Sequence, residues 1–184
     1  GCLGRDGHTR YGKIITTYTN RLIVPGASAT TEFDGYKIDD ISVQGKHVIT
    51  NTGTTATRQF TVDVEGKLSK PNGNYTEWVS HKTITQIDGL VSSLFPLDDI
   101  FKIEGSAYGK VKRENVIVAW RNEIIEPLIK RFNCRWIVKG KVRIARENLS
   151  TSSQWAGILD FGNGNCDDRA TITINSVVHE ISLH

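Results

Sequence analysis

Apolar and polar residues alternate along most of this chain. In "RQFTVDV", the apolar Phe60, Val62 and Val64 occupy alternate positions with polar residues between them. The same two-residue period recurs near the C-terminus in "ATITIN" and "SVVHEISLH", while "GKIITTYT" and "SHKTITQI" carry the threonine-rich composition of strands. Because side chains of a strand point alternately to its two faces, this period predicts half-buried antiparallel strands.

Glycine and asparagine cluster between these apolar runs. They occur in "NTGTT" at 51–55, "EGK" at 65–67, "KPNGN" at 70–74 and "FGNGN" at 161–165. Both residue types adopt a positive φ at low energetic cost, so each cluster is a predicted hairpin reversal. The expected result is a meander of about ten to twelve strands.

Helical periodicity is scarce. The segment 88–101 contains Pro96 and is interpreted as a loop insertion that returns the chain to the sheet. The segment 121–132 has apolar residues at helical spacing, but Pro127 interrupts it and both flanks look extended. We therefore predict a strand, a bulge and a second strand there.

These patterns define the expected fold class. The chain has 184 residues, which is enough for one domain with a core of its own. We predict a single all-β domain over residues 1–184, built as an antiparallel hairpin meander that forms a twisted sandwich or a partly closed barrel.

The distribution of charge and the lack of targeting signals restrict the partners and the location that we expect. The 23 Lys and Arg residues are dispersed among 20 Asp and Glu residues, so nucleic acid is not implied. No apolar stretch approaches the ~20 residues that span a bilayer, and the N-terminus lacks the features of a signal peptide. The chain is expected to be soluble and already processed or truncated. No motif for a nucleotide or other cofactor occurs.

The three cysteines point to a disulfide rather than to zinc. Cys2, Cys134 and Cys166 are far apart, without the spacing of a zinc site. Three pairings are possible, and buried unpaired thiols are the alternative. We favour Cys134 with Cys166, because one residue opens a strand and the other lies in a turn that a neighbouring strand end could reach.

The segment 159–175, "LDFGNGNCDDRATITIN", concentrates the most potentially reactive side chains. Asn163, Asn165 and Asp167 stand at alternate positions, as oxygen ligands do in calcium loops. However, the segment lacks the glycine at the sixth position and the distant bidentate glutamate, and Arg169 would place a positive charge beside the cation. We therefore interpret it as a hairpin in which Asp167 and Asp168 cap backbone N–H groups and Cys166 staples the turn, and we predict no metal site.

Catalytic patterns are weak. A cysteine nucleophile needs a histidine partner, but none of the five histidines is near a cysteine in the sequence, and all fall in turns or at strand positions interpreted as solvent-facing: His8, His47, His81, His179 and His184. Paired carboxylates for glycan hydrolysis can always be found among 20 acids. We therefore name no catalytic residue.

Tryptophan provides the most specific candidate for binding. Exposed aromatic side chains on a β-sheet bind sugar rings, whereas buried ones serve packing. Trp78 and Trp155 each lie among polar neighbours, in "NYTEWVS" and "TSSQWAG", and are the predicted exposed pair for a carbohydrate platform. Trp136 lies within the apolar "CRWIV".

The two ends of the chain are similar to each other. "GNCDDRATITIN" repeats, in shortened form, the order of residues in "GCLGRDGHTRYGKIITTYT". The later copy follows the strand "AGILDF", which has no counterpart before Gly1. This predicts that residues 1–184 are the C-terminal part of a longer protein.

An ordered set of segments resembles a known group of proteins. "DGHTRYGKI", "YKIDDISVQGKHVITNTG", "CRWIVKGKVRI" and "LDFGNGNCDDRATITIN", followed by "HEISL", resemble exported lipoproteins of uncharacterised function from Bacteroidetes-type bacteria. The resemblance spans nearly the whole chain and implies a location in the periplasm or at the outer-membrane surface, where disulfides persist. Cys2 does not match the lipid-anchor cysteine, so membrane attachment would come only through an anchor further upstream. The resemblance supplies no catalytic residues.

Taken with the weak catalytic patterns, this resemblance favours a non-enzymatic cell-envelope protein with a binding or structural role. Its candidate ligands are a glycan, bound at Trp78 and Trp155, or another envelope protein. A glycan-acting hydrolase with paired carboxylates is the alternative. A third possibility is an apolar cavity between the sheets, lined by valine and isoleucine, for a lipid-like ligand.

Overall fold

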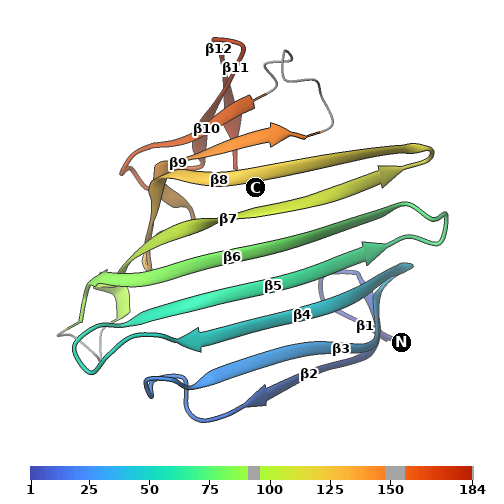
Figure 1. Ribbon diagram of the computed structural model, residues 1–184, viewed down its shortest axis with the longest axis horizontal. Helices are drawn as coiled ribbons and strands as arrows, with labels where there is room; N and C mark the ends of the chain where they lie inside the picture. The colour runs from blue at the N-terminus through green and yellow to red at the C-terminus, as the bar shows by residue number, and fades with distance from the viewer. Residues whose placement is uncertain (91–95, 148–155, 184) are drawn as a thin grey trace.

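A computed structural model describes residues 1–90, 96–147 and 156–183, and 70% of the chain is β-strand (Figure 1). The only helical element in the described residues is the 3-10 turn η1 (Pro96–Asp98). The strands are β1 (Cys2–Leu3), β2 (Thr9–Tyr18), β3 (Ser28–Ile38), β4 (Ile41–Asn51), β5 (Gln59–Ser69), β6 (Tyr75–Asp88), β7 (Ile100–Arg113), β8 (Val116–Arg131), β9 (Ile137–Arg146), β10 (Ala156–Asn163), β11 (Arg169–Ile174) and β12 (Val177–Ser182).

The strands form one antiparallel sheet in which spatial order follows sequence order. Each strand pairs with its predecessor and its successor, so β1 and β12 are the two edges (Figure 1). The register runs without a shift from β4 to β6, and only one shift occurs between β6 and β7, close to Asp88. The predicted antiparallel hairpin meander is therefore confirmed.

Three of the four predicted reversals are confirmed, and one is wrong. "NTGTT" joins β4 to β5, "KPNGN" joins β5 to β6, and "FGNGN" leads out of β10 towards β11. "EGK" instead continues β5, with Gly66 paired to Trp78 of β6. The indole of Trp78 occupies the space where a side chain at position 66 would lie, so this glycine accommodates a ring rather than a turn.

The prediction of a strand, a bulge and a strand around Pro127 is confirmed. This segment belongs to β8, whose pairing with β9 shifts register between Ile124 and Glu126 and again between Glu126 and Ile129. Proline has no N–H to donate to the ladder and is therefore confined to such irregular positions. Between 88 and 101, residues 91–95 lie outside the described part of the chain, and η1 leads into β7.

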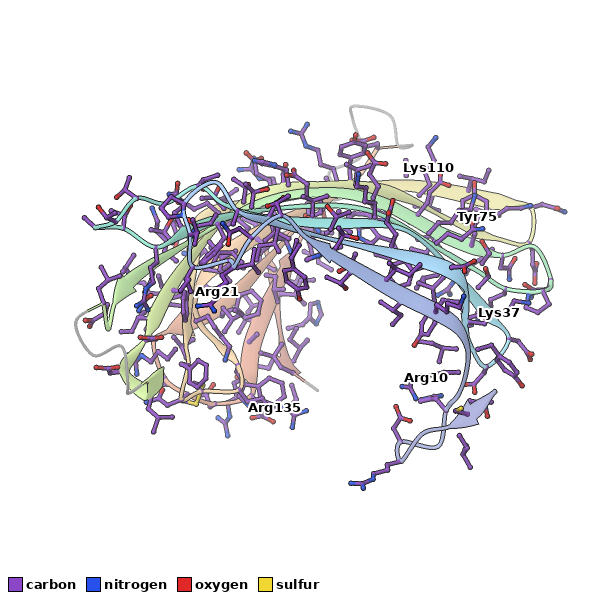
Figure 2. The ribbon with its side chains drawn as sticks, turned by 90° about the horizontal axis from the view of Figure 1, so that it is seen from below. Arg10, Arg21, Lys37, Tyr75, Lys110 and Arg135 are labelled. Atoms are coloured by element: carbon purple, nitrogen blue, oxygen red, sulfur yellow. A yellow bond between two sulfur atoms is a disulfide. The ribbon has the colours of Figure 1, made fainter. Side chains whose placement is uncertain are left out.

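The sheet curves into an arch with two chemically different faces. Figure 2 shows Tyr75 and Lys110 above the arch, on its convex side. Direct cross-strand partners lie on the same face of a sheet, and successive residues lie on opposite faces. The register places Lys110 opposite Glu77 on the convex face, so the neighbouring Trp78, paired with Gly109, belongs to the concave face.

Very little of the concave face is sealed from solvent. The buried apolar residues of the described chain are small for the most part, namely Ala27, Ala29, Ala107, Cys134, Val138 and Ala170. The accessible surface is 12259 Å². A compact protein of 20.5 kDa exposes about 8,800 Å², so this sheet exposes about 3,400 Å² more.

Candidate functional site

The concave face is a continuous apolar surface. It carries large apolar side chains from β2 to β11, and those named here are half-buried or exposed. They include Ile14, Tyr18, Phe33, Val43, Ile49, Phe60, Val62, Val64, Leu68, Trp78, Ile84, Ile103, Val111, Val118, Trp120, Ile144, Leu159, Ile172 and Ile174. Since soluble monomers seldom expose apolar patches of this extent, the concave face is the candidate functional site.

Glycine and tryptophan form a row across the middle of this face. The register aligns Gly66 of β5 with Trp78 of β6, and Trp78 with Gly109 of β7, which in turn faces Trp120 of β8. A Cβ atom at Gly66 would lie 2.4 Å from the Trp78 ring, and one at Gly109 would lie 2.9 Å from the Trp120 ring. Each indole therefore covers the backbone of the preceding strand, and the two rings are two strands apart.

Acidic residues are absent from the concave side of the described strands. Each Asp and Glu within these strands is in register with the convex face: Glu32, Asp34, Asp63, Glu65, Glu77, Asp88, Glu104, Glu123, Glu126, Asp160 and Glu180. Many of these carboxylates lie beside a basic side chain on that face. The Lys67 ammonium lies 3.3 Å from Glu77, and Lys102 lies 2.7 Å from Glu104.

Lys141 is the centre of the largest such cluster on the convex face. Its ammonium lies 2.8 Å from Glu126 and 3.7 Å from Asp160. The hydrogen bond to Glu126, reinforced by the charges of both carboxylates, raises the pKa of Lys141 above its usual value. The convex face is thus a solvated surface whose charges are largely matched to one another.

The concave side carries basic residues instead. Lys82 lies near the centre of β6, where its direct neighbours on this face are Val62 of β5 and Gly105 of β7. The Lys82 side chain is exposed and makes no hydrogen bond or ion pair within the described residues. Figure 2 places Arg21 and Arg135 below the arch as well.

The predicted disulfide between Cys134 and Cys166 is confirmed. The two Cα atoms lie 5.8 Å apart, and the bond joins the β8–β9 connection to the β10–β11 connection. Cys134 is almost fully buried, whereas Cys2 is a free, exposed thiol. The bond is compatible with an oxidising compartment outside the cytoplasm.

The segment 159–175 is the predicted hairpin. Asp167 accepts a hydrogen bond of 3.1 Å from the N–H of Arg169, as expected for a capping residue, and Asp160 accepts one from Gly162. For Asp168, the group that forms a hydrogen bond is the backbone carbonyl, which accepts the N–H of Leu183. Within the described residues, no group of three or more His, Cys, Asp and Glu side chains lies close enough together to hold a metal ion.

A shallow hollow of about 600 Å³ adjoins this hairpin. Asp160, Asp167 and Glu180 line it together with Arg169. Asp160 and Asp167 already accept hydrogen bonds from backbone N–H groups of their own loop, and we therefore assign them a structural role. A glycan-acting hydrolase stays a prediction without an assigned carboxylate pair.

The histidines differ in part from their predicted placement. His8 and His81 are exposed and bind the carboxylates of Asp39 and Asp63. His47 does not lie on the solvated convex face but on the concave one, where it pairs with Val64 and is half-buried. The alternation around His47 is interrupted by Gly45, and this obscured its assignment in the sequence.

The carbohydrate platform at Trp78 and Trp155 stays a prediction. Trp78 is half-buried, with its ring against Gly66, and Trp155 lies outside the described residues. Sequence patterns did not single out Trp120 or Lys82, because their places on the concave face follow from the pairing of distant strands.

No known protein family, curated protein or solved structure matches this chain at a significant level. In the part of the chain that the structure describes, no helix is long and apolar enough to cross a membrane.

Proposed function

We propose that this chain is a non-enzymatic binding protein of the bacterial cell envelope, and that its concave face holds an apolar ligand. The observation that carries the proposal is the continuous apolar surface, on which large side chains from β2 to β11 keep contact with solvent. Burying apolar area contributes roughly 25 cal/mol per Å², so a ligand that covers part of this face gains substantial free energy.

The envelope location rests on two supports. The Cys134–Cys166 disulfide is compatible with an oxidising compartment, and the sequence resembles exported lipoproteins. A binding role also agrees with the charge pattern, since the ion pairs of the strands lie on the convex face and leave the concave face to a ligand.

The alternation within one strand provides the test. We would titrate the protein with N-phenyl-1-naphthylamine, an uncharged apolar fluorophore, and follow methyl resonances of β5 by NMR. We expect the fluorescence to rise and the signals of Val62 and Val64, on the concave face, to shift. Thr61 directly precedes Val62 on the same strand but lies on the convex face, and it serves as the internal control because a probe in the arch does not reach it.

The proposal fails if the probe does not bind. It also fails if the signals that move belong to Thr61 and other convex residues, or to the hollow beside Asp167.

A further inference from the structure

We infer that the concave face takes an amphiphile with an anionic head, and that Lys82 binds the head group. This rests on the proposed function, because it names the class of ligand for the same face. The apolar side chains would hold an acyl chain, while the ammonium of Lys82 would meet a carboxylate or phosphate.

The position of Lys82 is unusual for a lysine. It belongs to a strand in the middle of the sheet, and it shares its face with Val62 and Ile84 rather than with an acid. Apart from Lys82, the lysine and arginine residues on the concave side of the strands lie near strand ends, at Arg10, Arg113, Lys130 and Arg146. Lysine is compatible with such a site because its aliphatic stem packs on apolar neighbours while the charge reaches water.

The surface beside Lys82 leaves room for a head group. Gly105 is its direct neighbour on β7 and has no side chain, and the adjoining concave pair, Ser80 and Ala107, consists of small residues. Larger side chains border this low area, with Val64 on β5 and Ile103 on β7. A polar head of modest size therefore fits next to the ammonium, with apolar surface extending away from it in both strand directions.

Charge complementarity selects an anion. Carboxylates within the described strands are confined to the convex face, so they offer Lys82 no partner on its own side. On the N-terminal side of the arch, the guanidinium of Arg10 is already bound by Asp6. Arg21 adds positive charge below the arch, and its side chain makes no hydrogen bond or ion pair within the described residues. A cationic or neutral amphiphile would gain nothing from this arrangement.

The experiment compares two ligands that differ only in charge. We would measure binding of cis-parinaric acid, a fluorescent long-chain fatty acid, and of its uncharged methyl ester, at mildly alkaline pH and below their aggregation concentrations. The wild-type protein should bind the acid about fivefold more tightly than the ester, as one partly exposed ion pair allows, and added salt should reduce that difference.

Two matched variants test whether Lys82 provides the positive charge that binds the head group. Lys82→Glu should weaken binding of the acid at least about fivefold and leave ester binding within about twofold. Lys110→Glu makes the same change on the adjacent strand and on the convex face, where Lys110 is also exposed, so it should leave both affinities unchanged. Circular dichroism checks that each variant keeps its sheet.

The outcomes separate the two proposals. Equal affinity for acid and ester, or equal losses in Lys82→Glu and Lys110→Glu, would overturn the anionic site while the apolar function stands. If neither ligand binds the wild-type protein, both proposals are rejected, and a protein partner becomes the better occupant of the concave face.

Discussion

Asp39 connects two hairpins that are neighbours only through the fold. Its carboxylate accepts the N–H of Thr9 at 2.8 Å and lies 2.7 Å from Nδ1 of His8, while its own N–H donates to the carbonyl of Thr9. The residue has a positive φ of 51°, which aspartate tolerates in a turn. One exposed side chain thus joins the β3–β4 turn to the start of β2.

These contacts predict a pH dependence. The hydrogen bond from His8, followed by that from Thr9, lowers the pKa of Asp39. A carboxyl whose pKa is lower in the folded state stabilises the protein above its unfolded pKa of about 3.9. That stabilisation is lost as the pH falls through the folded pKa. We expect NMR titration to give Asp39 a midpoint below about 3.9 and His8→Ala to raise it.

His47→Ala is the control for this titration, since His47 lies on β4 and does not contact Asp39. An Asp39 midpoint that is unchanged in His8→Ala would show that the ring contributes nothing.

At the scale of the elements, the row of glycine and tryptophan explains how wide aromatic rings fit on a sheet that curves towards them. Glycine in a strand usually weakens it, but here the missing side chain lets an indole lie on the backbone. The same residue type has two uses in this chain. In "KPNGN" it reverses the chain with a φ of 80° at Gly73, and in "EGK" it accommodates Trp78.

Adding a methyl group at Gly66 tests this explanation. Gly66→Ala should lower the free energy of unfolding by about 1–3 kcal/mol, as overpacking does, and shift the tryptophan emission to the red because a ring is displaced into water. Gly157→Ala is the matched control. A Cβ atom there would lie 3.4 Å from Ile172, an ordinary contact, so denaturant unfolding should change little.

Gly66→Ala with wild-type stability and emission would mean that the Trp78 ring does not depend on this glycine. Equal losses in Gly66→Ala and Gly157→Ala would point to a general intolerance of side chains instead.

The alternation of residues was sufficient to predict the strands, the meander and the irregularity at Pro127, because each depends on neighbours along the chain. It could not distinguish the glycine of a turn from the glycine beneath a ring, since that depends on a residue in the next strand. Lys82 shows the same limit: in "SHKTITQI" Ile84 and Ile87 stand on opposite sides of the alternation, and only pairing with Val62 assigns the lysine to the apolar face.

For the molecule as a whole, the disulfide is the one covalent link between distant segments. It joins residues separated by 32 positions and constrains the unfolded chain more than any single contact. The cysteine spacing restricted the choice of pairing but did not decide it, because three cysteines allow three pairings.

Replacing both cysteines tests the contribution of this bond. Cys134→Ala combined with Cys166→Ala should reduce the free energy of unfolding by about 3–4 kcal/mol, measured by denaturant titration, because the unfolded chain regains the entropy of an open loop. Cys2→Ala should leave stability unchanged, since this thiol is exposed and free. A double variant as stable as the wild type would show that the bond is not formed in solution.

The sequential order of the strands has a consequence for how the molecule is made. Every pairing from β1 to β12 joins consecutive strands, so no strand depends on a partner that is synthesised much later. A polypeptide that emerges N-terminus first can add each new hairpin to those already assembled. Synthesis and folding can therefore proceed together, and the two distant thiols can pair once the β10–β11 connection has emerged.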